Sequence, residues 1–178
     1  NISEFPVLVV TLSGNVPERV LTAAARDLRD RIEEVPGVLD ECLPRVEANM
    51  NEEQVQDFRL LKAASYLTMG NYNAGLNVFD QVLATARALR DTKYEEVCLA
   101  YIGLVQEMQD NYSQALICYR QALELASRNN GLYGIENLKK YPGRIGRIYF
   151  WLGDFEAATK QFQTGLRIAR DVRDQWQE

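Results

Sequence analysis

The chain has 178 residues, of which 47% are hydrophobic and 25% charged, with a formal net charge of −5 and no histidine. Without histidine, Ser-His-Asp and Cys-His nucleophiles, His-ligated zinc or iron, and a proton shuttle that titrates near neutral pH are all excluded. The length fits one domain, or one domain with a small additional unit. The mild negative charge does not favour a polyanionic partner, because phosphate binding needs clustered Lys and Arg.

The first element expected is a strand. Residues 6–13 are apolar and rich in β-branched side chains, which predicts a buried strand. A helix is expected to follow from Pro17, since Pro suits the first turn of a helix, and to end at Pro36-Gly37. A second short strand is then expected over Val38–Leu43, which gives a βα or βαβ unit within residues 1–47.

A lone strand leaves backbone N–H and C=O groups unpaired on both of its edges. We therefore expect the first strand to pair either with the same strand of a second chain or with Val38–Leu43. In the first case the chain forms a homodimer, and the oligomerisation contact contains Val7, Val9 and Thr11. The sequence does not decide between the two pairings.

The segment over residues 5–40 resembles a βαβ half of the porter region of resistance-nodulation-division efflux transporters. The resemblance rests on the apolar strand, on Pro17-Glu18, on the helix with Ala25 to Ile32, and on Val35-Pro36-Gly37-Val38. Membrane helices and proton-relay carboxylates of that family have no counterpart in the chain, so the resemblance implies no transport activity. It does imply a periplasmic origin for this segment.

A ten-residue pattern then occurs three times, beginning at Gly70, Asp110 and Gly153, so that the starts lie 40 and 43 residues apart. In every copy an aromatic residue is followed by a small residue and then by a second aromatic residue. These residues are Tyr72, Gly75 and Phe79; Tyr112, Ala115 and Tyr119; and Phe155, Ala158 and Phe162. Apolar residues at helical spacing flank each copy, which predicts a helix, a tight turn and a second helix in each repeat.

This pattern resembles the tetratricopeptide repeat over residues 51–178, in the long-helix subclass found in kinesin light chains and in adaptors that orient mitotic spindles. The resemblance implies a mainly α fold, an α-solenoid of three helical hairpins preceded by the N-terminal βα(β) unit. The repeats are expected at about 56–91, 96–130 and 139–174, within a domain that spans 48–178. A transporter-like segment ahead of such an array also suggests an artificial or recombined chimera.

Tetratricopeptide arrays bind peptides in a concave groove lined by the first helix of each repeat. The resemblance therefore implies a non-enzymatic protein-protein interaction module or scaffold. Transferred onto this sequence, the groove positions are Asp57, Leu60, Ala64, Leu67, Val97, Ala100, Leu104, Glu107, Met108, Lys140, Arg144, Arg147, Phe150 and Trp151. Arg144 and Arg147 share a helix face and are suited to a carboxylate or phosphate, with Trp151 adding an aromatic surface.

Each of these assignments has an alternative. Leu60, Leu104 and Met108 also fit the core between repeats, and the two arginines can instead be solvated or paired with acids nearby in the sequence. At the level of function, the alternative to a peptide-binding scaffold is a chimera whose N-terminal strand drives folding or homodimerisation, with no dedicated ligand.

Other chemistry has little support in the sequence. Three pairs of adjacent acids, Glu33-Glu34, Glu52-Glu53 and Glu95-Glu96, are expected in first turns or in solvent, and the three widely spaced cysteines predict neither disulfides nor a zinc site. We expect no enzyme activity, no cofactor, no metal and no nucleic-acid partner.

The expected partner is a protein or peptide with an acidic group. The longest apolar run is too short to cross a bilayer, and the expected compartment is the cytoplasm.

Overall fold

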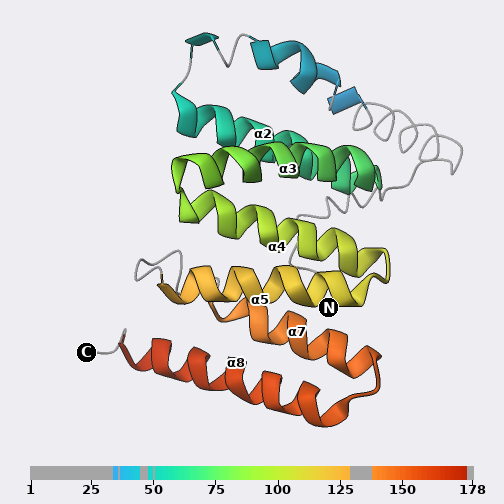
Figure 1. The fold of residues 1–178 in the computed structure, drawn as a ribbon, viewed down its shortest axis with the longest axis vertical. Helices are drawn as coiled ribbons and strands as arrows, with labels where there is room; N and C mark the ends of the chain where they lie inside the picture. The colour runs from blue at the N-terminus through green and yellow to red at the C-terminus, as the bar shows by residue number, and fades with distance from the viewer. Residues whose placement is uncertain (1–33, 36, 45–47, 50, 129–137, 176–178) are drawn as a thin grey trace, which may run out of the picture. The chain divides into compact units, whose positions relative to one another are not determined.

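The computed structural model describes residues 34–35, 37–44, 48–49, 51–128 and 138–175, and the side chains up to residue 171. The elements labelled in Figure 1 are all helices, and they form antiparallel hairpins that follow one another along the chain. They are α2 (Glu52–Thr68), α3 (Tyr72–Leu89), α4 (Thr92–Met108), α5 (Tyr112–Arg128), α7 (Lys140–Trp151) and α8 (Phe155–Gln175). The mainly helical fold with tetratricopeptide-like hairpins is thus confirmed.

The predicted second strand is wrong, because residues 37–44 are helical and contain all of Val38–Leu43. A short apolar run does not distinguish a strand from a buried helix segment by periodicity alone. Here Asp40 forms a salt bridge with Lys62 and accepts a hydrogen bond from the Tyr66 hydroxyl (3.2 Å) on α2. The predicted first strand, with Val7, Val9 and Thr11, lies outside the described residues.

The turns inside the three hairpins share one backbone geometry. Gly70, Asp110 and Gly153 each have a positive φ (+74°, +60° and +79°), the left-handed conformation that glycine and aspartate adopt most readily. The next residue donates its backbone N–H to a carbonyl five positions back. These bonds run from Asn71 to Tyr66 (2.9 Å), from Asn111 to Gln106 (2.8 Å) and from Asp154 to Tyr149 (2.9 Å). Each first helix therefore ends in a Schellman motif that turns the chain into the second helix.

The chain divides into two compact units, residues 1–78 and 79–178, with the boundary inside α3. In the first unit, Asn51 caps α2 reciprocally with Gln54, because each side chain bonds to the backbone of the other residue. The start of α3 packs on α2, and a Cβ added to Gly75 would lie 2.9 Å from a methyl carbon of Leu67. This close approach favours glycine, since any larger residue would have to displace the end of the Leu67 side chain.

The second unit contains the end of α3 and the helices α4, α5, α7 and α8. Within it α4 packs against α5, α5 against α7, and α7 against α8. Side chains from several of these helices form a buried core. Its members include Phe79, Val82, Leu99, Val105, Tyr119, Ile145 and Ile148. Pro142 lies in the first turn of α7, where its missing N–H removes no helical hydrogen bond.

Candidate protein-binding surface on the second unit

Glu107 links three helices of the second unit through its carboxylate. The side chain belongs to α4 and is only 5% exposed. The Tyr119 hydroxyl of α5 donates a hydrogen bond to Glu107 Oε2 (2.7 Å), and Arg147 of α7 donates from Nε to Glu107 Oε1 (2.8 Å). Arg147 Nη2 lies 2.5 Å from the same oxygen. Hydrogen bonds to a charged group are stronger than neutral ones, so this cluster fixes the positions of all three side chains.

Tyr119 is fully buried, and burial raises the pKa of its phenol well above the ordinary value. The Arg144 guanidinium lies 5.7 Å from the centre of the Tyr119 ring and opposes this rise, while Glu107 adds to it. Tyr119 therefore keeps its proton at neutral pH and serves Glu107 as a hydrogen-bond donor.

Beyond this cluster, Arg147 reaches the surface together with two aromatic side chains. Its guanidinium lies 5.3 Å from the centre of the Trp151 ring, and the Tyr112 ring lies 5.7 Å from Trp151. The Arg147 side chain is 41% exposed and Trp151 is 50% exposed. The Tyr112 hydroxyl donates to Asp110 (2.7 Å), and this bond is the main reason that the pKa of Tyr112 is raised. We call Tyr112, Arg147 and Trp151 the Arg147–Trp151 surface.

A second buried acid lies on α4 and was expected in solvent. Glu96 is fully buried, and the Tyr141 hydroxyl of α7 donates a hydrogen bond to Glu96 Oε1 (2.8 Å). The first-turn or solvated position predicted for Glu96 is therefore wrong, since Glu96 lies beyond the first turn of α4 and this contact with α7 holds it in the interior. Its neighbour Glu95 instead bonds to Arg87 near the surface (2.9 Å), while Glu52 and Glu53 lie in the first turn of α2 as predicted.

The predicted groove residues divide between the two units and differ in exposure. In the first unit Asp57 is exposed, while Leu60, Ala64 and Leu67 are half-buried. In the second unit Met108, Lys140, Phe150 and Trp151 are exposed, Val97, Ala100, Arg144 and Arg147 are half-buried, and Leu104 and Glu107 are buried. Leu104 therefore belongs to the core, which was the alternative left open for it. That the others line one binding groove remains a prediction.

Three tyrosines were not recognised as site residues from the sequence alone: Tyr112, Tyr119 and Tyr141. Glu96 and the contact of Glu96 with α7 were also missed. The sequence signal for these contacts is the separation of the partners. Arg147 follows Glu107 by 40 residues and Tyr141 follows Glu96 by 45, both close to the repeat period. A residue on the first helix of one repeat has its counterpart one period later on the first helix of the next, so an acid followed one period later by Arg or Tyr is a candidate contact between repeats.

The thiol of Cys98 on α4 is buried and unreactive. Cys98 is fully buried, and desolvation together with Asp80 raises the pKa of its thiol to about 12. Since the thiolate is the reactive form, Cys98 is inert at neutral pH. Among the residues that the structure describes, no group of His, Cys, Asp and Glu side chains is arranged to hold a metal ion. Nor is any helix in this part of the chain both long and apolar enough to cross a membrane.

Two family models, both described as tetratricopeptide repeat, match the chain at residues 57–128 and 143–172. The chain carries a tetratricopeptide-repeat array. The matched segments contain Glu107 and Tyr119 and all three residues of the Arg147–Trp151 surface. Repeats of this family are typical of non-enzymatic protein-interaction modules. Neither match includes residues 1–47, and nothing supports the transporter resemblance or the chimera.

The same fold occurs in the crystal structure of BtubC (BKLC) from P. vanneervenii, which superposes with a TM-score of 0.69 at 15% sequence identity. The alignment covers 84% of this chain and 60% of that chain. At this identity the likeness concerns the fold alone. No curated protein matches the sequence.

Proposed function

We propose that the chain is a protein-interaction module whose second unit binds a peptide of a partner protein on the side where α4 and α7 contribute Met108, Arg147 and Trp151. The observation that carries the proposal is the half-exposed Trp151 beside Arg147, whose guanidinium is fixed by the buried carboxylate of Glu107. Trp, Tyr and Arg dominate the energetics of protein interfaces, and side chains that are fixed before binding lose less entropy when a partner arrives.

The chemistry of the partner follows from the side chains around this surface. Met108 is 52% exposed at the end of α4 and adds a flexible apolar contact, which suits an apolar side chain of the peptide. Helix α7 contains three cations, Lys140, Arg144 and Arg147, and no acidic residue of its own. The helix is therefore positively charged, and we propose that a carboxylate of the peptide complements this charge.

Arg147 contributes to the surface mainly by holding its position, and less by offering hydrogen-bond donors to a ligand. Nε and Nη2 both point to Glu107, which leaves fewer of the five guanidinium donors for a ligand. Arg144 is half-buried over the Tyr119 ring, three residues before Arg147 and on the same face of α7. We propose that Trp151 supplies most of the contact energy and that Arg144 contributes to the preference for an acidic peptide.

A selection experiment tests this. A random-peptide phage library is panned on the immobilised 178-residue chain, and the enriched peptide is labelled and titrated by fluorescence anisotropy. We expect acidic peptides with apolar residues, and a Kd about tenfold or more higher for Trp151→Ala and several-fold higher for Arg144→Gln. Arg128→Gln is the matched control, since Arg128 is an exposed arginine on α5 paired with Glu124.

The proposal fails if the enriched peptides bind the Trp151→Ala and Arg144→Gln variants as tightly as the parent chain. Substituting Arg147 is not used as a first test, because it would leave the buried Glu107 carboxylate without its cation and would destabilise the fold. Circular dichroism confirms that each variant tested is folded.

A further inference from the structure

A row of exposed side chains on α8 repeats with the spacing of a helix-pairing seam. Phe155, Thr159, Phe162, Leu166 and Ala169 follow one another at intervals of four and three residues, and all five are exposed. Alternating intervals of four and three place residues along one stripe of a helix, and apolar residues at such positions pack against a partner helix. We call these five residues the α8 seam.

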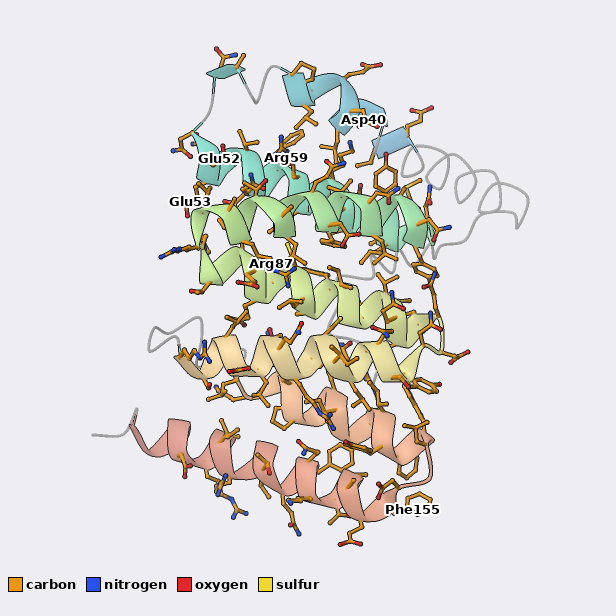
Figure 2. All side chains as sticks on the ribbon, in the orientation of Figure 1. Asp40, Glu52, Glu53, Arg59, Arg87 and Phe155 are labelled. Carbon is orange, nitrogen blue, oxygen red and sulfur yellow. The ribbon has the colours of Figure 1, made fainter. Side chains whose placement is uncertain are left out.

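The structure shows α8 covered on one side by α7. A Cβ added to Gly146 would lie 2.8 Å from the Phe162 ring, so one edge of this ring packs on α7. The rest of the seam is open: Phe155 is 62% exposed and Leu166 is 52% exposed. Phe155 lies at the start of α8 beside the hairpin turn (Figure 2), where its ring meets the Phe150 ring edge-on at 5.6 Å. In Figure 1 no described helix of the second unit lies on the other side of α8.

The charges beside the seam indicate which occupant fits. On the flank toward α7 the side chains are small, with Ala158 buried and Gly165 close to Pro142. On the outer flank, the positions directly beside the seam hold Glu156, Gln163 and Arg170, all exposed, while the exposed Lys160 and Arg167 lie one row further from the seam. The row beside the seam is negative near the start of α8, neutral in the middle and positive near the end.

When two copies of α8 lie antiparallel, the negative start of this row in one copy meets the positive end of the row in the other. We propose that the α8 seam pairs with the α8 seam of a second copy of this chain, antiparallel, about a twofold axis near Thr164. Leu166 then lies beside Phe162 of the second copy, Thr159 lies beside Ala169, and Glu156 lies close to Arg170. A parallel pair would instead bring Glu156 to Glu156 and Arg170 to Arg170.

Helix dipoles favour the same arrangement, because the positive end of each α8 lies near the negative end of the other. Because the surface is used twice around a twofold axis, the contact is closed and gives dimers, not filaments. The seam is separate from the Arg147–Trp151 surface, so the dimer presents two copies of that surface.

Sedimentation velocity of the 178-residue chain over a dilution series tests the proposal. We expect a reversible dimer that Leu166→Glu converts to a monomer, because the substitution places two carboxylates in the apolar contact. Arg170→Glu and Glu156→Arg should each raise the dimer Kd about tenfold, since each substitution removes two ion pairs of the symmetric contact. The double variant, with both charges exchanged, should return to within about threefold of the parent.

Lys160→Glu is the matched control. It reverses a charge at an exposed position of α8 that lies off the seam, so it should change the dimer Kd by less than about twofold. Circular dichroism shows whether Leu166→Glu is folded, and the charge-exchange series tests the contact even if it is not.

Three results would overturn the proposal. A parent chain that is monomeric at all concentrations would leave the seam to a different protein or segment. A dimer that persists in folded Leu166→Glu would place the contact elsewhere, for example in the N-terminal residues. Finally, a double charge exchange that does not restore the affinity lost in the single variants would exclude the antiparallel arrangement.

Discussion

Tyr119 and Phe162 occupy equivalent places in two hairpins of the second unit, yet Tyr119 is fully buried and Phe162 is 46% exposed. Each ring packs on a glycine of the preceding helix, Gly103 in the first case and Gly146 in the second. On its other side Tyr119 is covered by α7, with Arg144 over the ring, whereas no described helix of the second unit covers the other side of Phe162. The repeat motif therefore sets the geometry inside a hairpin, and the next hairpin determines how deeply the aromatic residue is buried.

The largest expected effect tests this difference directly. Tyr119→Ala should lower the free energy of unfolding by about 3–5 kcal/mol, because it leaves a large cavity in a closed core and removes a hydrogen bond from Glu107. Phe162→Ala should cost roughly half as much, since half of the ring is already in solvent. Urea denaturation followed by circular dichroism measures both.

Equal losses for the two substitutions would show that both rings are equally buried in solution. In that case a partner, such as a second α8, covers Phe162. Repeating the measurement on the monomeric Leu166→Glu background separates the intrinsic value of Phe162 from the contribution of a dimer, because that variant lacks the proposed contact.

The Tyr119 hydroxyl, which Phe162 lacks, gives the second prediction. Tyr119→Phe leaves Glu107 Oε2 without its donor and should cost about 1–3 kcal/mol at neutral pH. The folded pKa of Tyr119 is raised, so above about pH 10 the unfolded chain releases this proton while the folded chain keeps it. The parent should therefore lose stability as the pH rises, by up to about 1.4 kcal/mol per pH unit more than Tyr119→Phe does.

Urea titrations of the two chains from neutral pH to about pH 11 check both parts of this prediction. The sign is fixed: the parent is more stable at neutral pH, and its advantage shrinks in alkali. An advantage that stays constant across the range would mean that the Tyr119 phenol titrates alike in the folded and unfolded chains, which is inconsistent with its burial against Glu107.

Local patterns in the sequence were sufficient to predict the hairpins. The positive-φ turns at Gly70, Asp110 and Gly153 and the small residues that admit the aromatic rings depend on residues within one hairpin. The helix over residues 37–44 was missed because its contacts, from Asp40 to Lys62 and Tyr66, cross to another element and have no local signature.

The candidate site was predicted less completely for the same reason. Arg147 and Trp151 were found because the groove positions of the tetratricopeptide repeat were transferred onto this sequence, whereas the pairing of Arg147 with Glu107 depends on how two repeats stack. Glu96 was expected, together with Glu95, in a first turn or in solvent, but α7 covers it and supplies the Tyr141 hydroxyl. Burial of a charged residue depends on the next hairpin, which no local spacing encodes.

The glycines beneath the two rings give the smallest expected effect and the closest test of the comparison. A Cβ at Gly146 would lie 2.8 Å from the Phe162 ring, and a Cβ at Gly103 would lie 3.0 Å from the Tyr119 ring, so contact distance alone predicts the larger cost at Gly146. We expect the reverse, a larger cost at Gly103.

Phe162 can move into solvent, whereas Tyr119 is enclosed and bonded to Glu107. Only Gly103→Ala must therefore strain the core, by about 1–3 kcal/mol. Alanine is also better than glycine in a helix by about 1 kcal/mol. Urea denaturation should therefore show a net loss of about 1 kcal/mol for Gly103→Ala and little change for Gly146→Ala, and a larger loss at Gly146 would mean that Phe162 is held as firmly as Tyr119.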